Sequence, residues 1–199
     1  AYLEAAGLLH NARAEAAQKL DTAVMSELPP LKMEKARFIT MVEKQSEAGW
    51  GEQGFDSIAF TVSTNPNSPQ GALGKIASGG ELARFMLALK VNLAQSSQVG
   101  TMIFDEVDAG IGGATAQAVG ERLSKLGKKV QVLVVTHSPQ VAAQGAQHYK
   151  VEKNTQDNIT TTVVYELDAA ARREEVARML SGATITAEAR AAADVLLSA

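Results

Sequence analysis

The chain opens with apolar residues at the spacing of a helix, predicted over residues 1–28. The side expected to be buried carries Leu9, Ala12, Ala16, Leu20, Val24 and Leu28. The opposite side carries Arg13, Glu15, Gln18, Lys19 and Asp21. Pro29-Pro30 ends the helix, because proline has no amide donor and clashes with the preceding turn. Such a helix suits either the surface of a compact domain or the root of a coiled-coil arm, and the pattern is too short to decide.

The rest of the chain alternates between strand-like and helix-like stretches, which indicates an α/β protein. Strands are predicted at 36–45, 56–64, 101–104, 130–135, 147–153 and 159–167, and helices at 81–94, 114–126, 171–181 and 187–198. Residues 65–74, with two prolines and two glycines, are predicted to be a loop. Strand, helix and strand over 101–135 predict a βαβ unit with parallel strands covered by helices on both faces. The last two strands are expected to form a hairpin.

The amino-acid composition excludes several classes of protein and of functional site. The chain has 199 residues and 46% hydrophobic residues, which is enough for one sizeable domain and an appendage. It has no cysteine, so disulfides and thiolate metal sites are excluded and a reducing cytoplasm is a suitable location. No apolar run reaches the length of a membrane helix, so no membrane role is expected. A net charge of −3 gives no support to broad electrostatic attraction for nucleic acid.

Polar residues follow two of the predicted strands where each strand ends. Asp105 and Glu106 come after the apolar run 101–104, and His137 comes after 130–135. Ligands of parallel sheets bind at the carboxyl ends of strands, where carboxylates suit a cation and an imidazole can donate to a phosphate oxygen. The alternatives are a strand entering an acidic loop, and a histidine packed near a helix start at Ser138-Pro139.

Two glycine-containing segments flank the first of these strands. Ser78-Gly79-Gly80-Glu81 directly precedes a predicted helix, whose free amides and dipole suit a phosphate, although Ser78 and Glu81 also match a capping box. Asp108 begins Asp-Ala-Gly-Ile-Gly-Gly, and it could report across a subunit interface or cap the helix after Gly113. The sequence G-x-x-x-x-G-K-[ST] does not occur, so a single-site nucleotide hydrolase does not fit.

The order of these motifs resembles the C-terminal lobe of an ABC-type ATPase head, and within that superfamily the RecN family of bacterial, SMC-like repair proteins. The matching motifs are Ser-Gly-Gly-Glu within 76–90, Phe-Asp-Glu-Val-Asp-Ala-Gly-Ile at 104–111, Thr-His-Ser-Pro-Gln-Val-Ala-Ala at 136–143 and Glu-Val-Ala-Arg-Met-Leu-Ser-Gly at 175–182. Ser138 stands where relatives often have leucine. Transporter ATPases more often have glutamine at the position of Glu81.

The resemblance implies a role for each candidate residue. Ser78, Gly79, Gly80 and Glu81 would form the signature loop, which touches the γ-phosphate of ATP bound to a second head. Asp105 would hold Mg²⁺, Glu106 would be the catalytic base and His137 the switch histidine. Asp108 would lie in the D-loop. Residues 1–30 would be the returning helix of a coiled-coil arm, and residues 31–199 the C-terminal lobe of the head.

The resemblance also implies partners. A P-loop is expected in an N-terminal segment of the same protein, and two heads would enclose two ATP molecules, so that this chain alone binds ATP poorly and does not hydrolyse it. DNA is expected as a partner in double-strand break repair, in the bacterial cytoplasm at the nucleoid. One alternative is a transporter ATPase subunit, against which the helical arm and Glu81 argue. Another is a non-enzymatic scaffold, against which the intact Glu106 and His137 argue.

Overall fold

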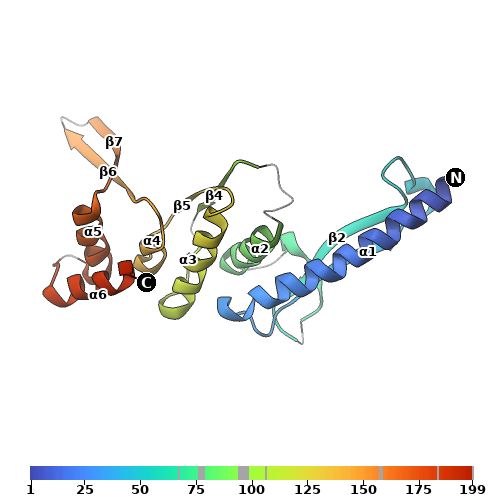
Figure 1. The fold of residues 1–199 in the computed structure, drawn as a ribbon, viewed down its shortest axis with the longest axis horizontal. Helices are drawn as coiled ribbons and strands as arrows, with labels where there is room; N and C mark the ends of the chain where they lie inside the picture. The colour runs from blue at the N-terminus through green and yellow to red at the C-terminus, as the bar shows by residue number, and fades with distance from the viewer. Residues whose placement is uncertain are drawn as a thin grey trace. The chain divides into compact units, whose positions relative to one another are not determined.

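The computed structural model describes residues 1–66, 68–75, 79–93, 99–105, 107–156, 159–182 and 184–198. Two compact units make up the chain, the first spanning Ala1–Ser97 and the second Gln98–Ala199. Figure 1 shows the elements of both units as a ribbon. Within the described residues, no helix is both long and apolar enough to cross a membrane.

The first unit places a long helix beside an antiparallel sheet (Figure 1). Its elements are α1 (Tyr2–Glu27), η1 (Pro29–Leu31), β1 (Arg37–Lys44), η2 (Glu47–Gly49), β2 (Asp56–Ser63), β3 (Gly71–Ala72), η3 (Leu73–Lys75) and α2 (Gly79–Leu93). β1 and β2 pair antiparallel along their whole length, from Arg37↔Ser63 to Lys44↔Asp56. The predicted helix and strands are confirmed. The prediction of a plain loop over 65–74 is wrong, because β3 pairs with β2 and η3 follows it.

The C-terminal end of α1 packs as predicted, with Val24 and Leu28 buried, but the earlier turns do not pack with the predicted side. Ala12 and Ala16 are exposed, whereas Ala17 is buried. Two polar residues of the predicted outer side face the strands instead, because Arg13 donates to Asp56 at 3.1 Å and Asp21 accepts from the Thr40 amide at 2.9 Å. Hydrogen bonds to strand residues thus decide the orientation of the helix, and part of its apolar stripe is left in solvent.

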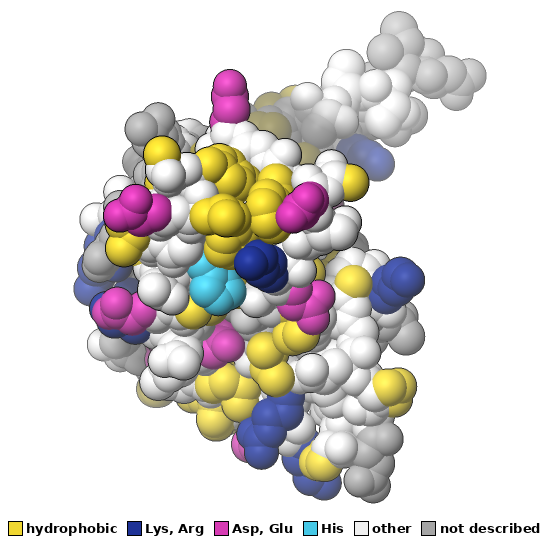
Figure 2. All heavy atoms as spheres, turned by 90° about the vertical axis from the view of Figure 1, so that its right-hand side faces the viewer, with side chains coloured by type: hydrophobic (Ala, Val, Ile, Leu, Met, Phe, Trp, Pro, Cys, Tyr) yellow, Lys and Arg dark blue, Asp and Glu magenta, His cyan; other side chains and the backbone are white. Residues whose placement is uncertain are grey.

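Aromatic side chains gather at the end of the first unit where α1 begins. The Tyr2 and Trp50 rings stack with their centroids 5.8 Å apart, and Trp50 also contacts Phe55 at 5.9 Å. The Lys44 ammonium lies 4.6 Å from the centroid of the Phe55 ring. Figure 2 shows hydrophobic side chains grouped on this face with charged side chains around them. Through these contacts, the start of α1 packs against the tip of the β1–β2 hairpin.

The second unit contains the βαβ unit that the sequence predicts. Its elements are β4 (Thr101–Asp105), α3 (Gly113–Gly127), β5 (Gln131–Val135), α4 (Pro139–Ala143), β6 (Tyr149–Gln156), β7 (Ile159–Glu166), α5 (Ala169–Ser181) and α6 (Ala187–Ser198). β4 and β5 are parallel, with Thr101↔Gln131 and Asp105↔Val135 at the ends of the register. β6 and β7 form the predicted hairpin, and the mixed α/β fold with a parallel sheet is confirmed.

Within the described residues, only one face of the parallel sheet is covered, which corrects the expectation of helices on both faces. Phe104 is buried, but its neighbour Ile103 is 65% exposed. On the paired strand, Leu133 and Val135 are 48% and 59% exposed. Successive side chains of a strand point to opposite faces, so these three residues form one bare apolar face.

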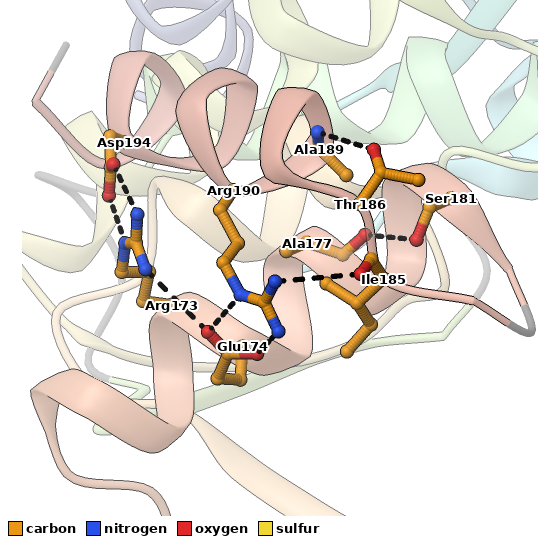
Figure 3. Close-up of polar contacts among 9 residues, drawn as sticks. All are labelled: Arg173, Glu174, Ala177, Ser181, Ile185, Thr186, Ala189, Arg190 and Asp194. Carbon is orange, nitrogen blue, oxygen red and sulfur yellow. Dashed lines mark hydrogen bonds and ion pairs between the residues drawn. The ribbon is translucent and has the colours of Figure 1, made fainter.

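The C-terminal helices α5 and α6 pack as a pair. Val176, Ala177, Ala189 and Ala193 form their buried contact, with Ile185, Leu196 and Leu197 around it. Two arginine–carboxylate pairs cross between the helices (Figure 3). Arg173 donates to Asp194 at 2.7 Å, and Arg190 donates to both oxygens of Glu174 at 2.8 and 2.9 Å. These partly exposed pairs fix the alignment of the two helices more than they add stability.

Candidate functional site

The tips of β4 and β5 meet at one edge of the sheet. Asp105 is paired with Val135, so the ends of the two strands lie side by side. The Asp105 side chain is exposed, and so is His137. The helix start next to His137 is present, because α4 begins at Pro139 with Ser138 as its N-cap, but the His137 side chain is not packed against it in a buried position. Glu106, the predicted base, lies outside the described residues. The parallel register therefore brings the predicted metal ligand and the predicted switch histidine to the same edge.

Asp108 joins the two strand tips. Its side chain is buried, with 1% of the residue exposed, and Oδ2 accepts a hydrogen bond from the Thr136 hydroxyl. The same hydroxyl oxygen accepts from the Ser138 amide at 2.9 Å. Asp108 does not cap the following helix, because the N-cap of α3 is Gly112 and has no side-chain cap. The capping alternative is therefore wrong, and the carboxylate instead supports the turn that carries His137.

The loop after β4 is shaped to hold that carboxylate. Val107 is buried and anchors the start of the loop. The amide of Ile111 donates to the Asp108 carbonyl at 3.3 Å, which closes a turn over 108–111. Gly110 adopts a φ of 73°, a conformation that glycine adopts without steric cost. Together these features direct Asp108 inward, towards β5.

α4 continues the chain after His137 and is held from two sides. Pro139 occupies its first turn, as the sequence predicts. On α3, a Cβ at Gly120 would lie 3.2 Å from both the Gln140 carbonyl oxygen and the Val141 Cα, so α4 approaches α3 closely at this glycine. On α5, the Arg172 guanidinium donates to the carbonyl oxygens of Ala143, at 2.9 Å, and Gly145. The position of the His137 turn thus depends on α3 and α5.

The glycine-containing segment begins α2, in the first unit. Gly79 and Gly80 are the first helical residues, two positions earlier than predicted, and a Cβ at Gly79 would meet no described atom within 4 Å. Glu81 lies in the first turn. Burial lowers the pKa of Arg84 from its ordinary value, and the Coulombic attraction of Glu81 opposes this effect. Ser78 lies outside the described residues, so its predicted cap is untested.

Comparison with known proteins gives the family. Residues 10–161 match the family model described as the RecF/RecN/SMC N terminal domain. The chain belongs to this family. It is 47% identical over 189 residues to the DNA repair protein RecN of Rickettsia bellii, covering 95% of this chain and 34% of that protein. It is 44% identical over 198 residues to the RecN of Vibrio cholerae, covering 100% of this chain and 36% of that protein. The resemblance to RecN is thereby confirmed.

The fold of this family member also matches solved structures. The Smc head domain with a coiled coil and joint from Pyrococcus yayanosii has a TM-score of 0.59 at 15% identity, covering 82% of this chain and 29% of that chain. At this identity the match concerns the fold alone. The chain spans about a third of the length of the RecN relatives that it matches.

One described carboxylate of this family member, Asp105, fits the ligand set of a magnesium nucleotide. Among the described residues, no group of three or more histidine and carboxylate side chains could hold a metal ion. Mg²⁺ on a nucleotide, however, needs only one or two protein carboxylates, because phosphates and water supply its other ligands. The exposed Asp105 at a strand tip fits that requirement.

Sequence reasoning missed two residues of the site, Thr136 and Arg172. Threonine is common in strands, so nothing marked its hydroxyl as the link between the strand tips. Arg172 carried a weak signal: it lies with Arg173 in the first turns of α5, where the helix dipole disfavours cations. An arginine in that position indicates a partner elsewhere in the fold, which here is the end of α4.

We expect Arg172→Met to destabilise the second unit by about 2–3 kcal/mol, because carbonyl oxygens at the end of α4 lose a charged donor. Urea unfolding followed by circular dichroism would measure the change. The matched control is Arg173→Met, which removes a partly exposed ion pair from the same helix and is expected to cost less than about 1 kcal/mol. Equal losses in the two variants would contradict the role of Arg172.

Proposed function

We propose that this chain forms the C-terminal lobe of the ATP-hydrolysing head of a RecN-like protein that acts in DNA double-strand break repair. The observation that carries the proposal is the parallel register of β4 and β5, which brings Asp105 and the His137 turn to one sheet edge. In open α/β sheets this edge is where ligands bind. The names of the RecN relatives support the repair role.

Each polar group at this edge has a distinct task in the proposal. Asp105 holds Mg²⁺, which neutralises charge on the phosphates when it is bound. Glu106 takes a proton from the attacking water, and the exposed His137 donates a hydrogen bond to a phosphate oxygen. Ser78, Gly79, Gly80 and Glu81 contact the γ-phosphate of ATP held by a second head, where the start of α2 offers free amides.

The proposed head is completed by a P-loop segment elsewhere in the same protein. The bare face of the β4–β5 sheet supports this, because parallel strands are normally covered on both faces. The larger part of each RecN relative has no counterpart in this chain. ATP then closes two such heads on each other, and hydrolysis releases them, as in a ligand-biased two-state switch.

Residues 1–30 are proposed to be the returning helix of a coiled-coil arm, and residues 31–199 the lobe itself. Leu8 is 70% exposed, and the exposed Ala12 and Ala16 follow it at four-residue spacing, so the three form an apolar stripe that no described residue covers. A second helix against this stripe would bury it. DNA is the proposed partner of the complete protein, at the bacterial nucleoid.

The test of this function is the dependence of ATP hydrolysis on Mg²⁺ in the full-length protein. Asp105→Asn should raise the Mg²⁺ concentration for half-maximal activity by at least about ten-fold, because a direct metal ligand loses its charge. Asp194→Asn, on the partly exposed Arg173 ion pair of α6, is the control and should leave that concentration unchanged. Absence of ATP hydrolysis by the wild-type protein, or an unchanged Mg²⁺ dependence in Asp105→Asn, would count against the proposal.

A further inference from the structure

Asp108 is more deeply buried than a residue in a loop that faces a second head needs to be. Only 1% of the residue is exposed, and Oδ2 is occupied by the Thr136 hydroxyl. Oδ1 is also buried, and it has no hydrogen-bond partner in the part of the chain that the structure describes. A buried carboxylate oxygen without a partner is costly, so the arrangement needs a reason other than stability.

The Thr136 hydroxyl acts both as a donor and as an acceptor of hydrogen bonds in this arrangement. It donates to Asp108 and accepts from the Ser138 amide, and these two bonds lie on either side of His137 in the chain. The turn 136–138 is therefore tied at one point to the loop after β4. His137 itself is exposed. Its imidazole ring can therefore reach a ligand in solvent, while the bonds of Thr136 fix the backbone on either side of it.

We propose that Asp108 is a positioning residue that acts through Thr136 to fix the His137 turn against the tip of β4. The inference rests on the proposed function, because positioning matters for turnover only if His137 and Glu106 act on ATP. It assigns Asp108 a role inside its own chain rather than in contact with a second head. A shift of about 1 Å in a catalytic group can cost as much as about 100-fold in rate, so one hydrogen bond at this place has a large effect.

The test compares single and double variants in the full-length protein. Asp108→Ala and Thr136→Val should each lower kcat for ATP hydrolysis by about ten-fold or more and change KM by less than about three-fold. The double variant should be no slower than the slower single variant, because both changes break the same link. Thr136→Ser keeps the hydroxyl and should restore most of the rate.

Thr115→Val is the matched control. Thr115 is buried on α3, in the same unit, and its hydroxyl has no hydrogen-bond partner within the described residues. The same chemical change should therefore leave kcat unaffected there. If Asp108→Ala fails to fold, as judged by thermal melting, Thr136→Val and its serine rescue still decide the question.

Three results would overturn the inference: wild-type turnover in Thr136→Val, multiplied effects in the double variant, or loss of ATP-dependent dimers in Asp108→Ala but not in Thr136→Val. A second measurement separates this inference from the proposed function. In histidine-labelled protein, the ring resonance of His137, identified with His137→Gln, should shift in Thr136→Val and not in Thr115→Val. If Thr136→Val shows that shift but the wild-type protein has no ATPase activity, the proposed function alone is rejected. If the wild-type protein has normal ATPase activity but Thr136→Val shows no shift, the positioning role alone is rejected.

Discussion

Replacing Glu106 by glutamine should lower ATP turnover in the full-length protein by about 100-fold or more while ATP binding is kept. Glutamine cannot accept a proton from the attacking water, and loss of a general base lowers the rate by about 100-fold or more. Since the γ-phosphate would stay intact, the heads should remain closed on ATP. Steady-state phosphate release would measure the first effect, and gel filtration in ATP would show the persisting dimers.

The control for this variant is Glu121→Gln on α3. The Glu121 side chain is about half exposed, and it contacts residues of its own helix. We expect wild-type turnover there. Turnover in Glu106→Gln within a few-fold of wild type would remove Glu106 from the role of base, whatever the behaviour of the control.

Ser78→Arg should prevent the formation of ATP-dependent dimers. In the proposed head, Ser78 precedes the free amides of α2 and meets a phosphate of the other head, so a long side chain would keep the surfaces apart. The fold should survive, because α2 is anchored by buried residues further along the helix, including Phe85, Leu87 and Ala88. Multi-angle light scattering with and without ATP would measure the dimer, and circular dichroism would check the fold.

Ser46→Arg provides the comparison, because Ser46 is exposed in the first unit and makes no side-chain cap for η2. It should dimerise as wild type does. ATP-dependent dimers in Ser78→Arg at wild-type concentration would mean that the signature segment does not contact the second head.

The sequence predicted the elements of the second unit because their patterns are local. Apolar runs of strand length that end in polar residues gave β4 and β5, and the helix between them gave the parallel pairing. The motif order also identified the family correctly. The sequence therefore predicts Asp105 and His137 at one sheet edge, and the parallel register agrees with that prediction.

What the sequence did not predict depends on contacts between distant residues. The orientation of α1 is set by Arg13 and Asp21, whose partners Asp56 and Thr40 are separated from them by 43 and 19 positions. The link from Asp108 to Thr136 spans 28 positions, and Asp108 does not cap the following helix, which was one of the two alternatives for this residue. Hydropathy patterns carry no information about such pairings, because a polar residue on a helix reads as solvent-facing unless its partner is known.

The bare face of the β4–β5 sheet also has a practical consequence. Ile103, Leu133 and Val135 would promote aggregation of this chain when it is produced by itself, because exposed apolar patches attract one another. Polar substitutions at the three positions should improve its solubility. The same substitutions would prevent assembly with a covering segment. Solubility of the isolated chain therefore favours polar side chains at these positions, whereas assembly of the complete head favours apolar ones.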